Sequence, residues 1–242
     1  MMLTIRSSLY FLMMVLSTLF FGLLMAIFGW FLPFIATSKI ANAWGLSNLF
    51  FLKWICGLEY KVTGIENLPD STAAIIMSKH QSAWETIAFR GIFPANQAWV
   101  LKRELMFVPV FGWALATVQP IAIDRKSGSK AAKQVIEQGV ERLNQGRHVI
   151  IFPEGTRVAP GESKRYGIGG ALLAAKVTQF PVIPVAHNAG VFWKRRGLIK
   201  LPGTIEVIIG KPINTEGMSA KEIINQVEKD IEEKMQSLPD HI

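Results

Sequence analysis

Apolar residues are distributed unevenly along this chain, and their pattern changes near residue 58. Beyond that point, short apolar runs of strand length alternate with longer amphipathic stretches of helical period. The runs predict strands at Tyr60–Thr63, Ala73–Met77, Ala98–Leu101, Pro120–Asp124, His148–Phe152, Val182–Ala186 and Thr204–Ile209. Strands that alternate with helices form a largely parallel sheet covered on both faces. We therefore expect an α/β fold with a mostly parallel mixed sheet of about seven strands flanked by helices.

The amphipathic stretches predict the helices of this part of the chain, at Ser82–Phe93, Val110–Ala116, Ser129–Asn144, Gly169–Thr178 and Ser219–Gln236. The last helix is the best marked, because Ser219 and Glu222 form a capping-box pattern and apolar residues then recur every four positions. Neither a repeat nor a low-complexity linker interrupts the sequence here. Residues 59–242 are therefore expected to form one domain.

The first 58 residues have a different character. Leu9–Ile35 contains no charged side chain and is almost wholly apolar, and Ile40–Leu58 is again apolar and aromatic. The first run exceeds the roughly 20 residues that cross a bilayer as a helix. We expect a membrane-embedded helical pair at residues 1–58 with a bend near Pro33, and the pattern leaves open whether the pair spans the bilayer or lies within one leaflet.

A cleaved secretory signal peptide is the alternative interpretation of this region. Arg6 resembles a basic n-region, and Ala41-Asn42-Ala43 resembles a cleavage site. The apolar region, however, is far longer than the roughly 7–15 residues of a signal-peptide core, and a second apolar segment follows it. The membrane anchor is therefore the preferred interpretation.

The formal net charge is +8, which on a membrane-bound chain favours contact with anionic headgroups and anionic substrates. Nucleic acid is not expected as a partner, because no nucleic-acid-binding motif occurs. The single cysteine, Cys56, excludes an internal disulfide and fits a domain that faces the cytosol. No metal is expected, because zinc-site spacing is absent from the histidines His80, His148, His187 and His241.

One histidine lies between a predicted strand and a predicted helix. His80 comes five residues before Glu85, and Ser82 is a candidate N-cap for the helix. Loops at this edge of an α/β sheet carry chemistry, and a neutral imidazole oriented by a carboxylate can take a proton from an alcohol. The competing interpretation is a capping box in which Ser82 and Glu85 only close the helix start. Both can hold if His80 precedes the helix proper.

Two other predicted strands end in charged residues. Lys102 and Arg103 follow one strand and suit a phosphate, although a solvated loop pair is the commoner fate of such a dipeptide. Asp124 and Arg125 end another strand, and we expect them to have a structural role.

A third segment, Phe152–Arg157, follows a predicted buried strand and contains a carboxylate, a hydroxyl and a guanidinium. Arg157 can bind two phosphate oxygens at once, and Gly155 lets the backbone turn closely enough to present them. The alternative is a strand-ending turn in which Glu154 and Arg157 form an ion pair.

In this order, the segments resemble the glycerolipid acyltransferase family, most closely its 1-acylglycerol-3-phosphate (lysophosphatidate) acyltransferases. Phe152–Arg157 matches the third block of the family residue for residue, and Val182–Val185 matches the fourth. His80–Glu85 matches the first block, H-x-x-x-x-D, with glutamate in place of aspartate. Lys102–Leu105 with Ile123–Arg125 resembles the second.

The resemblance implies transfer of a fatty acyl group from acyl-CoA or acyl-carrier-protein to the sn-2 hydroxyl of lysophosphatidic acid, giving phosphatidic acid without an acyl-enzyme or a cofactor. His80 would be the general base, and Glu85 would hold its ring. The implied phosphate-binding residues are Lys102, Arg103, Glu154, Gly155, Thr156 and Arg157. Anionic membrane lipids are the further expected partners. The expected location is the cell inner (plasma) membrane, with the catalytic domain facing the cytoplasm.

Two functions of other classes remain open from the sequence. One is a membrane-anchored hydrolase in which His80 activates water. The other is a non-catalytic lipid-binding protein whose basic loops bind headgroups.

Overall fold

A computed structural model describes residues 1–239, with the side chain of Lys126 excepted. Within these residues a seven-stranded sheet forms in the order β1-β7-β6-β2-β5-β3-β4. The strands are β1 (Leu58–Thr63), β2 (Ile75–Ser78), β3 (Gln97–Lys102), β4 (Ile121–Ile123), β5 (His148–Ile151), β6 (Val182–His187) and β7 (Gly203–Ile209). Neighbouring strands are parallel except for the antiparallel pair β6 and β7. The expected α/β fold with a mostly parallel mixed sheet is confirmed.

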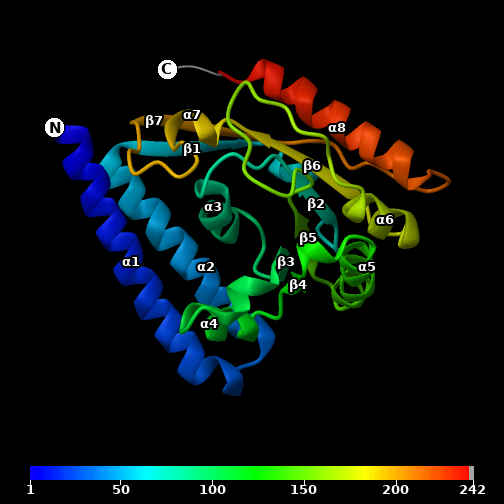
Figure 1. Ribbon diagram of the computed structural model, residues 1–242, viewed down its shortest axis with the longest axis horizontal. Coiled ribbons are helices and arrows are strands. Elements are labelled where there is room, and N and C mark those ends of the chain that lie inside the picture. The colour runs from blue at the N-terminus through cyan, green and yellow to red at the C-terminus, as the bar shows by residue number, and fades with distance from the viewer. Residues whose placement is uncertain (240–242) are drawn as a thin grey trace.

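Different helices cover the two faces of the sheet (Figure 1). The helices are α1 (Met2–Phe28), α2 (Phe34–Phe51), α3 (Trp84–Ile92), α4 (Phe111–Thr117), α5 (Ser129–Asn144), α6 (Gly169–Lys176), α7 (Ala189–Phe192) and α8 (Ala220–Ser237). Successive side chains of β2 point to opposite faces. Ile75 and Met77 join the core under α5, α6 and α8, whereas Ile76 joins the core under α3.

Helices α1 and α2 form an antiparallel pair along one flank of the molecule, drawn in blue in Figure 1. A short 3-10 turn, Gly29–Phe31, joins them, and Pro33 is the N-cap of α2. Proline suits this position because it has no amide hydrogen to lose at a helix start. The predicted helical pair and its bend near Pro33 are therefore present.

One helix among the described residues is long and apolar enough to cross a membrane. It covers Met2–Phe31, has a mean hydropathy of 2.5 in its most apolar window, and only 17% of that window is buried. An exposed apolar surface of this length indicates association with a membrane.

The inner face of α1 is part of the protein core. Tyr10 is fully buried and makes an edge-to-face contact with Trp193, with ring centroids 5.7 Å apart. Ser7 Oγ accepts a hydrogen bond from the Lys200 amide at 2.9 Å. The inner face of α1 is therefore packed against the rest of the described structure.

Candidate active site

The three segments singled out in the sequence meet at one edge of the sheet. Strands β2, β5 and β3 are neighbours and run parallel, so their carboxyl ends lie side by side. His80 follows β2, the segment Phe152–Arg157 continues from β5, and Lys102 ends β3. Since neighbouring strands are about 4.8 Å apart, β2 and β3 are separated by roughly 10 Å. The topology therefore brings the candidate residues to one rim.

His80 lies in the loop before α3, and Glu85 lies in the first turn of that helix. His80 Nδ1 is 2.7 Å from Glu85 Oε1. An ionised carboxylate can only accept a hydrogen bond, so Nδ1 carries the proton and Nε2 is left as the basic nitrogen. The side chain of His80 is 12% exposed, whereas that of Glu85 is completely buried. This geometry is that of a histidine oriented by a buried carboxylate.

The environment of Glu85 keeps it ionised. Burial acts to raise the pKa of Glu85, but the nearby His187, the hydrogen bond from His80 and the amide of Ser82 outweigh it, and the pKa is lowered from its ordinary value. Glu85 Oε1 also accepts from the amides of Gln81 and Ser82, at 2.8 and 2.7 Å. Four groups therefore favour the charged form that orients the histidine.

The start of α3 combines the two interpretations of the sequence motif. Glu85 bonds the Ser82 amide, as in a capping box, but Ser82 Oγ accepts from the Trp84 amide at 3.2 Å and not from the Glu85 amide. The N-cap is Ala83, one residue later than the expected Ser82. The complete capping box, with hydrogen bonds in both directions, does not form because Ser82 lies one residue before the N-cap. Glu85 thus closes the turn and holds His80 at the same time.

The segment after β5 packs against the His80 loop and hydrogen-bonds to it. The ring of Phe152 stacks on the His80 ring, with centroids 4.2 Å apart and an angle of 18° between the planes. Glu154 Oε2 accepts from the His80 amide at 2.7 Å. The His80 carbonyl in turn accepts from the Val158 amide at 2.8 Å. The histidine is therefore fixed through its ring, its amide and its carbonyl.

Glu154 is buried beneath this loop and pairs with Lys79. Lys79 Nζ lies 2.9 Å from Glu154 Oε1 and 2.8 Å from Glu232 Oε1 of α8. Burial raises the pKa of Glu154, and the hydrogen bonds from Lys79 and from the His80 amide oppose that shift. The Arg–Glu ion pair considered for this turn is thus replaced by a Lys79–Glu154 pair.

The last residues of the Phe152–Arg157 segment are less buried than Glu154. Gly155 has φ of +68°, a left-handed conformation that favours glycine, and its carbonyl accepts a hydrogen bond from Arg125. Arg125 therefore has the structural role expected of it. Thr156 is exposed and Arg157 is partly buried, with the Arg157 carbonyl accepting from Arg195 at 2.6 Å.

Lys102 and Arg103 are exposed at the end of β3. None of the interactions described for residues 1–239 joins them to His80, Glu85 or Arg157. The structure thus ties His80, Glu85 and Glu154 together by direct contacts, and places the two cations on the same edge by topology alone.

Sequence reasoning missed the residues that support the site from distant elements. Glu232 lies on α8 and His187 ends β6, where its Nε2 donates to the Lys79 carbonyl at 2.9 Å. Both residues are far from His80 in the sequence, and no local sequence pattern predicts that they lie near it. Lys79, adjacent to His80, could have been suspected, since a lysine directly after a buried strand needs a carboxylate partner.

The described part of the chain holds no cluster of three or more His, Cys, Asp or Glu side chains able to bind a metal ion. His241, one of the histidines weighed in the sequence, lies outside the described residues.

Comparisons with known proteins bear on this site. A family model described as acyltransferase matches residues 59–188. A 1-acyl-sn-glycerol-3-phosphate acyltransferase of Pseudomonas aeruginosa is 42% identical over 221 residues, which cover 90% of this chain and 84% of the relative. The alpha form from Mus musculus is 28% identical over 177 residues, and the match spans 72% of this chain but only 62% of the mouse protein.

The fold also resembles a solved structure. The 1-acyl-sn-glycerophosphate (LPA) acyltransferase PlsC from Thermotoga maritima superposes with a TM-score of 0.78 at 22% identity. The superposition covers 97% of this chain and 94% of that one. The two proteins therefore share one fold over nearly their whole length.

Proposed function

The chain belongs to the acyltransferase family, among the 1-acylglycerol-3-phosphate acyltransferases, and we propose that His80 is the general base with which it makes phosphatidic acid. His80 Nε2 takes the proton of the sn-2 hydroxyl of lysophosphatidic acid. The observation that carries this proposal is the 2.7 Å contact from His80 Nδ1 to the buried Glu85, which leaves Nε2 as the basic nitrogen.

The acyl group moves in one transfer without an acyl-enzyme. The deprotonated hydroxyl oxygen attacks the thioester carbonyl carbon, a new C–O bond forms, and the C–S bond breaks. The imidazolium of His80 returns its proton to the departing thiolate, so the histidine ends as it began. Glu85 stabilises the imidazolium between the two proton transfers. The donor is acyl-CoA or acyl-carrier-protein, and no metal or cofactor enters these steps.

The phosphate of lysophosphatidic acid is held on the open side of the rim. Arg157 binds it through a bidentate contact, and Lys102 and Arg103 add positive charge from the end of β3. Gly155 and Thr156 shape the turn that presents Arg157. The exposure of Thr156, Lys102 and Arg103, and their position at the same sheet edge as His80, support this assignment.

Glu154 has a different task in this proposal from the phosphate contact that the sequence suggested. Its carboxylate is buried and already occupied by the His80 amide and by Lys79. A second anion beside it would be repelled. Glu154 is therefore a positioning residue that holds the His80 loop.

Residues 1–58 anchor the enzyme, and residues 59–242 carry out the reaction. The anchor keeps the mouth of the site at the bilayer, against anionic lipids of the inner (plasma) membrane on its cytoplasmic side. The advantage is energetic, because moving a two-tailed product through water costs about 0.8 kcal/mol for each exposed CH₂.

The test is turnover of lysophosphatidic acid by the purified full chain in detergent, with acyl-CoA and acyl-carrier-protein as paired donors. His80→Ala should lower kcat by about 10²–10⁴ while the protein stays folded. His148→Gln is the control, because His148 is 3% exposed at the opposite edge of the sheet and its ring accepts a hydrogen bond from the Ala74 amide.

Product analysis separates transfer from hydrolysis and from simple binding. Phosphatidic acid should form only when lysophosphatidic acid and a donor are both present. Retained transfer in His80→Ala would refute the general base. Release of free fatty acid alone from the wild-type protein would refute acyl transfer.

A further inference from the structure

A turn between α7 and β7 carries three consecutive cations, Lys194, Arg195 and Arg196, which we call the basic turn. All three side chains are exposed. No acidic residue occurs between residues 188 and 204, so the positive charge is not balanced within this part of the chain. A concentrated surface charge of this kind attracts anions.

The backbone of the basic turn has a fixed shape. The Gly197 amide donates to the Lys194 carbonyl at 2.8 Å, and Trp193 Nε1 donates to the Gly197 carbonyl at 3.2 Å. Arg196 has φ of +60°, a left-handed conformation that glycine adopts more easily than any residue with a Cβ atom. A glycine would therefore fit this position with less strain, and the presence of an arginine indicates a use for its side chain.

The basic turn is connected to the active-site loop through one peptide group. Arg195 Nη1 donates to the Arg157 carbonyl at 2.6 Å. The amide of the same peptide group, that of Val158, donates to the His80 carbonyl at 2.8 Å. Because a peptide group is flat and short, the Arg195 guanidinium lies within about 8 Å of the His80 carbonyl. The basic turn therefore borders the rim on which the proposed base lies.

The proposed function assigns no residue to the anionic end of the acyl donor. Arg157, Lys102 and Arg103 are assigned to the phosphate of the lysolipid. Acyl-CoA and acyl-carrier-protein both carry the acyl group on a phosphopantetheine arm, whose phosphate lies roughly 15 Å from the thioester when the arm is extended. Since the thioester must reach His80, this phosphate has to lie on the protein surface close to the rim.

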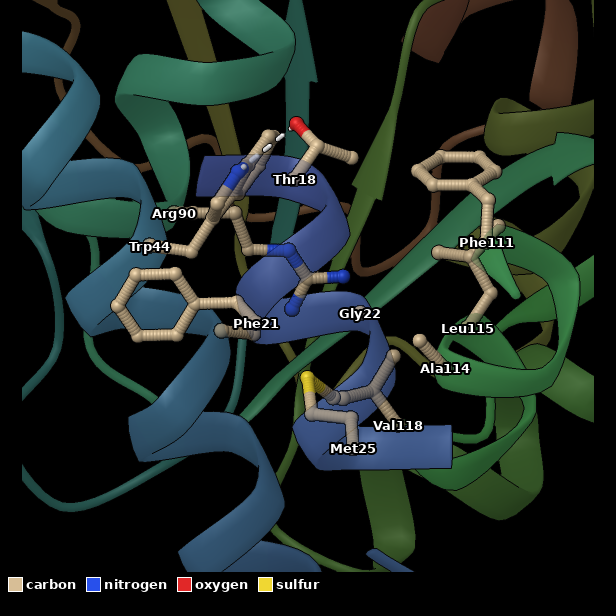
Figure 2. A pocket seen from close by; sticks show the side chains of 11 residues that line it. Thr18, Phe21, Gly22, Met25, Trp44, Arg90, Phe111, Ala114, Leu115 and Val118 are labelled. Carbon is tan, nitrogen blue, oxygen red and sulfur yellow. Dashed lines mark hydrogen bonds between the residues drawn. The ribbon is translucent and has the colours of Figure 1, made fainter. Parts of the chain in front are cut away.

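The cavity between α1 and α4 does not suit this phosphate. Figure 2 shows Phe21, Phe111 and Val118 among the side chains that line it, and most of the lining is apolar. Arg90 also extends into the cavity but is only 6% exposed, so a phosphate would have to lose its water to reach it. Exposed cations beside the rim bind a phosphate without this cost.

We propose that the basic turn binds the phosphate of the phosphopantetheine arm of the acyl donor, whichever carrier the arm belongs to. This inference rests on the proposed function, because it requires the thioester to lie at His80. Lysine and arginine bind phosphate through charge-assisted hydrogen bonds, and one guanidinium can bind two phosphate oxygens. The donor and the lysolipid then use different cations, so both anionic substrates can occupy the rim together.

Two donors that differ only in this phosphate test the proposal. The full chain in detergent receives the palmitoyl thioester of either phosphopantetheine or pantetheine, with lysophosphatidic acid as acceptor, and kcat/KM is measured for each donor. The wild-type chain should prefer the phosphorylated donor about tenfold or more, as expected for hydrogen bonds between charged groups. Equal use of the two donors would overturn the proposal while leaving acyl transfer itself intact.

Variants locate the phosphate. Lys194→Gln/Arg196→Gln keeps the bond from Arg195 to the active-site loop, and it should lower the preference for the phosphorylated donor about tenfold. Lys194→Arg/Arg196→Lys keeps the charges and should keep the preference, which separates the effect of charge from a structural role. Lys211→Gln is the matched control and should also keep it, because Lys211 is exposed after β7 at the opposite edge of the sheet.

Two results with the double glutamine variant would refute this location. One is an unchanged preference for the phosphorylated donor. The other is a higher KM for lysophosphatidic acid without loss of that preference, which would assign the basic turn to the lysolipid.

The two natural carriers distinguish the sources of the phosphate. Palmitoyl-CoA and palmitoyl-acyl-carrier-protein should lose kcat/KM to a similar extent in the double glutamine variant, because they share the arm. A loss confined to one carrier would overturn the proposal, since the basic turn would then bind a part of that carrier other than the shared arm.

A binding measurement decides the matter without turnover. Phosphopantetheine that carries a hexadecyl thioether cannot transfer its chain, and its Kd for the full chain in detergent is measured by calorimetry. The Kd should be about tenfold higher for the double glutamine variant than for the wild-type chain. An unchanged Kd would overturn the proposal, whether or not His80 is the general base.

Discussion

The carboxylate of Glu154 accepts a hydrogen bond from the backbone amide of His80 at 2.7 Å. The segment that follows β5 therefore holds the loop that follows β2. The same carboxylate pairs with Lys79, whose ammonium also reaches Glu232 on the C-terminal helix α8. The orientation of the proposed base thus depends on three elements that are distant in the sequence.

Replacing Lys79 should destabilise the protein more than any surface change. The side chain of Lys79 is 3% exposed and that of Glu154 is fully buried, so Lys79→Met leaves a buried carboxylate without its cation. The expected loss in the free energy of unfolding is about 3–5 kcal/mol, measured by denaturant titration in detergent. Adding Glu154→Gln removes the stranded charge and should restore part of this loss.

Glu232→Gln is the control for that experiment. Its carboxylate is 38% exposed, so losing its bond to Lys79 should cost about 1 kcal/mol or less. If Glu232→Gln destabilises the protein as much as Lys79→Met, the Lys79–Glu154 pair is not the dominant contact.

Glu85→Gln separates the two tasks of Glu85. Glutamine can still accept from the Ser82 amide and close the helix start, but it carries no charge to orient and stabilise the His80 imidazolium. We expect kcat to fall by about 10²–10⁴ with little change in helix content. Steady-state kinetics with lysophosphatidic acid measure the effect.

Glu222→Gln is the matched control, because Glu222 completes a full capping box with Ser219 at the start of α8, and none of its contacts within residues 1–239 is to a histidine. It should leave kcat unchanged. Full activity in Glu85→Gln would show that Glu85 is only a helix cap.

The pH dependence of stability follows from the lowered pKa of Glu85. A carboxyl group whose pKa is lower in the folded state than the unfolded value of about 4.3 contributes stability above that value and loses it as the pH falls through the folded pKa. The wild-type chain should therefore unfold at a higher temperature than Glu85→Gln at pH 7. This difference should shrink as the pH falls below about 4. A difference that is independent of pH would contradict ionisation of Glu85.

Arg157→Ala should act on the acceptor. Loss of a bidentate contact to the phosphate should raise KM for lysophosphatidic acid about 10- to 100-fold, with a smaller effect on KM for the acyl donor. Lys133→Ala, a change to an exposed cation on α5, serves as the control. If the KM of the donor alone rises, Arg157 binds the donor and not the lysolipid.

The centre of the sheet could be predicted from the sequence because β2, β5 and β6 are short runs that are buried throughout. Val182–Ala186, for example, is apolar throughout and lies wholly inside the sheet. The four-residue helix α7 could not be predicted, since it is too short to show a helical period. Helix boundaries were less certain, as the N-cap at Ala83 shows.

The site was only partly accessible to the same reasoning. The five-residue spacing of His80 and Glu85 predicted their pairing, because both lie within one loop and one helical turn. The sequence suggested a phosphate contact for Glu154, whereas tertiary packing surrounds it with Lys79 and the His80 amide.

The first helix is not an interchangeable tether. Its inner face supplies Tyr10 to the core beneath Trp193, and Ser7 bonds the backbone of Lys200. Proteolytic removal of this helix would uncover an apolar wall of the catalytic half instead of releasing a soluble enzyme. Loss of the membrane contact and unfolding of the catalytic part would then occur together. The protein would remain folded only while it is bound to the membrane that contains its substrate.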